Sequence, residues 1–197
     1  MKLNRVTIGV KTKTGRAIAV ALSEPASSPQ FVCREELALS DQAVPPTMQP
    51  YHEVMELPWS ESMIAVQPTI NAIERIAAAS LRKLIAEIET RGFRVACIAV
   101  VGPADRKLER IGNPHIRAHA AEGVLFRAVA EKAAEANDRE TRSFVDPAAE
   151  LKRPAREVKS VLARLGKTAG SPWRAEEKSA AMAAWAALTP RRQSSAR

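Results

Sequence analysis

The first forty residues alternate short apolar runs with polar turns. Residues 6–10, 17–22 and 31–39 are three such runs, rich in Val, Ile, Ala and Leu. The short turns between them contain Lys, Gly, Ser and Pro. Runs of this length that are separated by turn residues predict three consecutive strands, and the short turns predict an antiparallel meander.

The pattern then changes from strands to a helix. Residues 44–58 contain Pro45-Pro46 and fit no regular period. They predict a long connection that extends over residues 44–68. Between residues 69 and 91 apolar side chains recur at helical spacing over about five turns. The nearly all-apolar run FRVACIAVV at 93–101 predicts a central strand that is covered on both faces.

The second half of the chain alternates helix and strand signals. Asn113-Pro114 has the residue types of a helix N-cap and first turn, and that helix is expected to continue to residue 136. TRSFV at 141–145 predicts a short strand, and two helices are expected at about 151–165 and at 175–188. This order predicts an α/β fold, in which one mixed five-stranded sheet carries helices on both faces.

Charge and composition narrow the functional classes. The net charge is +8 and the pI is about 9.9, a balance that favours polyanionic partners such as nucleic acid. No apolar run is long enough to span a membrane and the N-terminus lacks a signal-peptide core, so a cytoplasmic protein is expected. Cys33 and Cys97 lie in apolar strand-like runs, which predicts two buried thiols and no disulfide.

Several segments together resemble one family. These are IAVV at 98–101, AHAAEGVLFRAV at 118–129, RSFV at 142–145 and the segment 157–185 with Lys159, Gly166 and Lys178. In the order of its elements the chain resembles RuvC-type Holliday-junction resolvases of the RNase H-like superfamily. The resemblance implies one RNase H-like domain over residues 1–188 with strand order 3-2-1-4-5. Residues 189–197 are expected to form a disordered basic tail.

The residues differ from that family where its chemistry takes place. Such nucleases carry a carboxylate on the first strand, one at the end of the fourth and a pair in a final helix, and these acids hold two divalent ions. Here Lys11 stands on the first strand, the fourth ends Val100-Val101-Gly102, and Glu176 and Glu177 are assigned to a helix before the missing acidic pair. The resemblance therefore implies a divergent member without the usual acids and without a resident cofactor.

The first hairpin also resembles the phosphate-binding turn of actin-like ATPases. Those proteins need a second, similar domain to close over the nucleotide, and this chain is too short to hold both.

Basic and aromatic residues give the candidate nucleic-acid contacts. They are Lys11, Lys13 and Arg16 in the first hairpin, Lys152, Arg153, Arg156 and Lys159 on a basic helix, and Trp173 with Arg174, which could stack an unpaired base. Each group has an ordinary structural alternative: a solvated turn, a solvated helix face, and a tryptophan that fills the core under a loop.

One helix carries a potential metal-binding pattern. His115, His119 and Glu122 are spaced i, i+4, i+7, so they share one face of the helix, as ligands of a divalent ion would. Three side chains of a single helix rarely converge on one ion. We therefore expect no metal site here, and a helix start packed under a loop is the alternative.

The sequence favours a RuvC-like protein that binds nucleic acid without cleaving it. One alternative is an active phosphodiesterase that uses Asp105, Glu122 and Asp146 with Mg²⁺ or Mn²⁺. Another is a non-enzymatic interaction domain whose basic face contacts an acidic protein. The oligomeric state stays open, a homodimer included, and no membrane partner is expected.

Overall fold

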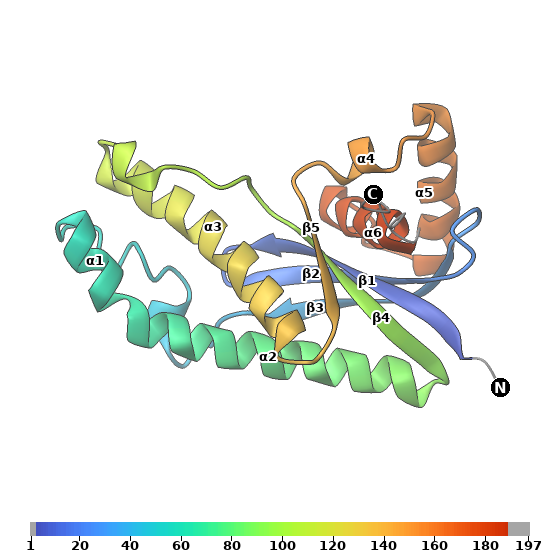
Figure 1. Cartoon of the computed structure of the whole chain (residues 1–197), viewed down its shortest axis with the longest axis horizontal. Coiled ribbons are helices and arrows are strands. Elements are labelled where there is room, and N and C mark those ends of the chain that lie inside the picture. Colours follow the sequence, from blue (N-terminus) through green and yellow to red (C-terminus); the bar gives the residue numbers. More distant parts are fainter. Residues whose placement is uncertain (1–2, 189–197) are drawn as a thin grey trace, which may run out of the picture.

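The computed structural model describes residues 3–188, which form one five-stranded sheet with helices on both faces (Figure 1). The strands are β1 Asn4–Lys13, β2 Arg16–Ser23, β3 Gln30–Ala38, β4 Phe93–Val101 and β5 Glu140–Phe144. The helices are α1 Trp59–Ala65, α2 Gln67–Thr90, α3 Pro114–Glu135, α4 Pro147–Glu150, α5 Ala155–Ala169 and α6 Ala175–Leu188. Two short 3-10 turns lie at Pro45–Thr47 and Leu108–Arg110.

The sheet has the order β3-β2-β1-β4-β5, as the resemblance to RuvC-type resolvases implies. The first three strands form the antiparallel meander, and β4 and β5 join parallel to β1. β1 is therefore the central strand, and near its end Lys11 lies opposite Ile18 of β2 and Val101 of β4. The mixed α/β fold with helices on both faces is confirmed.

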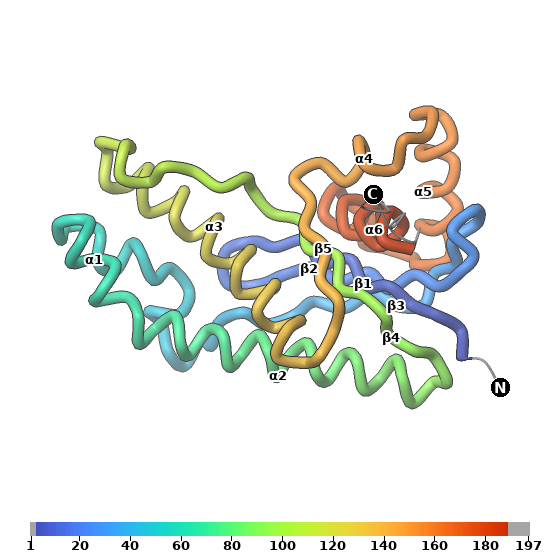
Figure 2. The backbone as a smooth tube through the Cα atoms, in the orientation of Figure 1, coloured from blue at the N-terminus to red at the C-terminus, as the bar shows by residue number. Residues whose placement is uncertain are grey.

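The two faces of the sheet pack against different helices, because successive side chains of a strand point to opposite faces. Ile8 and Val10 pack in a core with α2 and α3. On the other face, Val20 and Leu22 of β2 pack against α5 and α6. The backbone trace shows α2 and α3 on one side of the sheet and α6 with α5 on the other (Figure 2).

Helix α6 lies unusually close to the sheet. A Cβ atom added to Gly9 of β1 would stand 1.8 Å from the carbonyl oxygen of Ala180. The face that α6 buries is made largely of alanines, including Ala180, Ala183 and Ala184. Small side chains on both elements therefore let the helix cross β1 in near backbone contact.

Two predicted segments are corrected. The helix expected at about 151–165 runs over Ala155–Ala169, because Pro154 holds an extended ψ of 137° at its N-cap and cannot continue a helix from residue 151. Residues 147–150 form the separate short helix α4. The long connection at 44–68 ends earlier than predicted, since α1 and the first two residues of α2 lie within it.

The two cysteines lie too far apart for a disulfide. Cys33 lies on β3 and Cys97 on β4, so β2 and β1 separate them, at a spacing of roughly 14 Å that a disulfide cannot bridge. The expected tail at 189–197 falls outside the described residues. None of the helices described here is both long and apolar enough to cross a lipid bilayer.

Candidate functional site

A cavity of about 600 Å³ opens at the end of β1, between α3 and α6. The end of β1 and the following turn contribute residues 11–14, α3 contributes His119 and Phe126, and α6 contributes Glu176 and Ser179. β1 thus delivers the predicted residues Lys11 and Lys13 to the carboxyl end of the central strand. In open α/β sheets, ligands bind outside the carboxyl ends of the strands.

Lys11 is half-buried at this cavity. Burial lowers the pKa of its ammonium group below the ordinary value of 10.5, and the neighbouring Lys13 lowers it further. The adjacent Thr12 is buried, and its hydroxyl donates a hydrogen bond to the carbonyl of Val101 at 3.1 Å, which fixes the end of β1 to the end of β4. The site therefore holds a partly desolvated cation, and an anion in the cavity would stabilise its charged form.

Lys13 pairs with a carboxylate that the sequence reasoning excluded. Its Nζ lies 2.7 Å from Oε1 of Glu176, and this hydrogen bond lowers the pKa of the Glu176 carboxyl below its ordinary value. Glu176 was assigned to a helix before the family's final one. The structure instead shows α6 as the helix that crosses β1, β2 and β4, which puts Glu176 at the edge of the cavity.

The cavity does not have the donor set that two divalent ions need. Of the described residues that line it, Glu176 alone is acidic, and Lys13 already engages it. Lys11 and Lys13 would repel cations placed between them, and Val100 and Val101 at the end of β4 are buried apolar side chains. The residues present do not fit the two-metal arrangement of the nuclease family that the chain resembles.

Arg16 and Arg174, also predicted contacts, lie around a neighbouring cavity of about 390 Å³ that shares Glu176 with the first. The guanidinium of Arg16 contacts Glu36 at 2.6 Å. The backbone N–H of Arg174 donates to Oε2 of Glu177 at 2.7 Å, which closes the N-terminus of α6. Arg16 is thus already paired with an acid.

The predicted basic helix is exposed at Lys152, Arg156 and Lys159, and of these only Lys152 lies before α5. Arg153 differs from them, because it pairs with Glu157 and its guanidinium lies 5.1 Å from the centre of the Trp185 ring. Arg153 therefore contributes to packing as well as to the charge of this face.

Trp173 is held by specific contacts in the core. Its Nε1 donates a hydrogen bond to the carbonyl of Leu162 at 3.0 Å. Its ring packs edge to face against Phe31, with the ring centroids 6.4 Å apart. The same ring also lines a cavity of about 480 Å³ together with Arg153, Lys159 and Lys178. The structure thus brings three of the predicted nucleic-acid residues together, although Trp173 is more enclosed than a free stacking platform.

The acids of the alternative phosphodiesterase do not meet. Asp105 is exposed in the loop after β4 with an oxygen 3.6 Å from Arg127, and Asp146 caps the N-terminus of α4. Glu122 is fully buried in α3, where it accepts a hydrogen bond from His52. None of the three is among the described residues that line the cavity at the end of β1.

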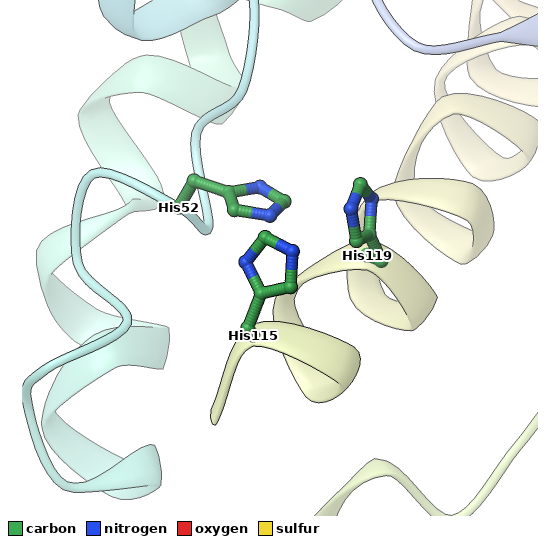
Figure 3. Close-up of side chains that lie close together, drawn as sticks. All are labelled: His52, His115 and His119. Atoms are coloured by element: carbon green, nitrogen blue, oxygen red, sulfur yellow. The ribbon is translucent and has the colours of Figure 1, made fainter. Parts of the chain in front are cut away.

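The helical metal pattern is also rearranged. His115 and His119 do lie on one face of α3, but their third neighbour is His52 from the long connection rather than Glu122 (Figure 3). Glu122 lies behind this group and contacts it through His52. The sequence offered no local signal for His52, because the segment around it has no regular period.

Comparison with known proteins supports the fold. No protein-family model matches the chain, and no curated protein matches its sequence. The structure of RuvC from Thermus thermophilus is similar, with a TM-score of 0.51 and 11% identity over 93% of each chain. T. thermophilus RuvC in complex with a Holliday junction substrate gives a TM-score of 0.52 and 12% identity, again over 93% of each chain. The chain thus has a RuvC-like, RNase H-like fold.

Proposed function

We propose that this protein binds nucleic acid through the cavity at the end of β1 and does not cleave it by a two-metal mechanism. The observation that carries the proposal is Lys11, a half-buried cation on the central strand of a RuvC-like sheet. A phosphate oxygen beside Lys11 would be neutralised by direct contact. Binding of that kind does not need two catalytic metal ions.

A second group of residues supports the same ligand class. Arg156 and Lys159 are exposed on α5, exposed Lys152 lies just before that helix, and Lys159 shares a cavity with Trp173 and Lys178. Lysine and arginine contacts to phosphates release counterions and give binding that depends weakly on base sequence. The net charge of +8 adds a long-range attraction to polyanions.

The similar T. thermophilus protein binds a Holliday junction, so a four-way junction is the first ligand to test. Affinity should be measured by fluorescence anisotropy for a labelled junction, a duplex and a single strand. We expect binding that falls steeply between about 50 mM and 200 mM salt. Lys11→Ala and the triple variant Lys152→Glu, Arg156→Glu, Lys159→Glu should weaken binding to all three ligands.

The control is Lys83→Glu, which reverses a highly exposed charge on α2, on the other side of the sheet. This variant should bind as the wild type does. No binding of any ligand at low salt, or equal loss in the control, would contradict the proposal.

Cleavage is tested separately on the same ligands and on RNA–DNA hybrids with Mg²⁺ or Mn²⁺. We expect no products from the wild type, and none from Lys11→Asp, because a single new carboxylate does not complete a two-metal site. Metal-dependent cleavage that disappears in Asp105→Asn, Glu122→Gln or Asp146→Asn would instead support the phosphodiesterase alternative.

A further inference from the structure

All the histidines of this chain meet at one place. The sequence contains three, and these are His52, His115 and His119. His52 comes from the connection before α1, and the other two come from the first turns of α3. Two distant segments thus bring together the side chains most often used to bind transition metals.

The three rings surround a common point. Their centroids are 4.5 to 4.9 Å apart in every pair, and the planes cross at 74° to 80°. One nitrogen from each ring lies within 4.8 Å of the other two. Figure 3 shows the rings turned toward the space between them rather than stacked in a column.

A buried carboxylate determines which nitrogen of His52 is available. Glu122 is fully buried, and its Oε1 lies 2.8 Å from Nδ1 of His52 and 3.3 Å from the backbone nitrogen of the same residue. A carboxylate acceptor places the proton on Nδ1 and leaves a lone pair on Nε2. That Nε2 is buried and has no hydrogen-bond partner among the described residues.

We propose that His52, His115 and His119 bind a divalent transition metal, with zinc as the ion that fits best. Three imidazoles and no carboxylate suit zinc, whereas magnesium and calcium prefer oxygen ligands. Zinc–nitrogen bonds of about 2.0 Å in a tetrahedral site put the nitrogens roughly 3.3 Å apart. The three nitrogens, now within 4.8 Å of one another, would have to move closer together to reach that spacing, and the exposed rings of His115 and His119 are the ones with room to turn.

Glu122 acts in this site as a positioning residue. Metal-binding histidines commonly donate their second ring N–H to a carboxylate, which orients the ring and makes the ligand nitrogen more basic. The Glu122–His52 contact has this geometry. The same contact provides the buried carboxylate of Glu122 with a hydrogen-bond partner. Such a partner is needed because an unpaired charge inside a protein is strongly unfavourable.

The metal would join the long connection to α3, beside the cavity that His119 also lines. Three protein ligands leave the fourth position of a tetrahedral ion to water or an anion. Exposed His115 and His119 give the ion access from solvent. The site does not depend on nucleic-acid binding, so it is tested on the protein alone.

The first experiment uses protein without a histidine tag, stripped with a chelator and then incubated with zinc. After gel filtration, elemental analysis should find about one zinc per chain. Zinc at about a hundred times its dissociation constant should raise the melting temperature by about 5–10 °C, and excess EDTA should reverse the change. Cobalt(II) should give the intense visible absorption of a four-coordinate site.

Variants distinguish metal ligation from simple packing. His115→Gln changes an exposed ring, so the protein should fold, lose the cobalt absorption and lose the zinc-induced shift in melting temperature. Glu122→Gln should weaken zinc binding about 10- to 100-fold. The matched control Glu53→Gln changes an exposed carboxylate next to His52 in sequence and should bind zinc as the wild type does.

Absence of zinc from the wild type after gel filtration, with an unchanged melting temperature, would overturn the proposal. So would equal zinc affinity in the wild type and His115→Gln. Either result would leave the three rings as an edge-to-face packing arrangement that needs no ion.

Discussion

The ammonium of Lys13 lies 2.7 Å from the carboxylate of Glu176, and this ion pair connects the end of β1 to the first turn of α6. Both side chains are partly exposed, at 43% and 27%. The pair therefore adds little to stability, as is usual for ion pairs in contact with water. In the nucleic-acid binding proposed above its effect would be greater, because Glu176 neutralises one of the two lysines at the cavity.

Glu176→Gln should strengthen nucleic-acid binding. The substitution keeps the size of the side chain, removes a negative charge from the cavity edge and releases Lys13 for contact with a phosphate. We expect an increase in affinity of roughly 3- to 10-fold and a rise of about one in the slope of log affinity against log salt. Anisotropy titrations at several salt concentrations measure both quantities.

The control for this variant is Glu87→Gln, which releases Lys83 in the same way on α2. Its affinity and salt slope should equal those of the wild type. If Glu176→Gln also left both unchanged, Lys13 would not be a phosphate contact.

Lys11→Met should make the protein more stable and a weaker binder. Burial lowers the pKa of Lys11, so folding disfavours its charged form. This cost is fully present below the folded-state pKa and disappears as the pH rises through it toward 10.5, the ordinary value. Urea unfolding should give Lys11→Met the higher midpoint at pH 7, and the gap should narrow near pH 10.

Lys13→Met serves as the comparison, because its loss removes an ion pair instead of a partly desolvated cation. This variant should gain no stability at pH 7. A Lys11→Met protein that is less stable than the wild type at pH 7 would show that the ammonium group has a stabilising partner when folded.

Gly9→Ala should strongly destabilise the protein. The new methyl group would overlap the carbonyl of Ala180, a backbone atom that cannot move without shifting α6. We expect a loss of about 3 kcal/mol in the free energy of unfolding, the upper end of the usual range for an overpacked core. Gly112→Ala meets no atom within 4 Å and should change this free energy by less than about 0.5 kcal/mol. Similar values for both variants would contradict the close contact.

Local patterns predicted most of the fold because they reflect local physics. Asn113 caps α3 through a hydrogen bond to the backbone of Ile116, and Pro114 takes the first helical position, as their residue types indicate. The order of the elements predicted a mixed five-stranded sheet, and the strand order came from the family resemblance. The start of α5 was predicted too early, at about residue 151, because Pro154 stands in an extended conformation and the helix begins only at Ala155.

The candidate site was harder to predict because it depends on long-range contacts. His52 has no periodic neighbours, so its approach to α3 could not be read from spacing. Glu176 was excluded because the sequence did not reveal which late helix crosses the sheet. The run AAMAAWAAL at 180–188 did hold a signal, since a helix face of alanines can fit closely against a glycine on a strand.

The position of α6 also affects how the chain can fold during its synthesis. Every described strand precedes α6 in the chain, yet α6 covers the face of the sheet that holds Val20 and Leu22. Until residues 175–188 leave the ribosome, that apolar face has no α6 to cover it, even if the strands have already paired. The nascent sheet would then be a natural target for chaperones, since exposed apolar surface and unpaired strand edges promote aggregation.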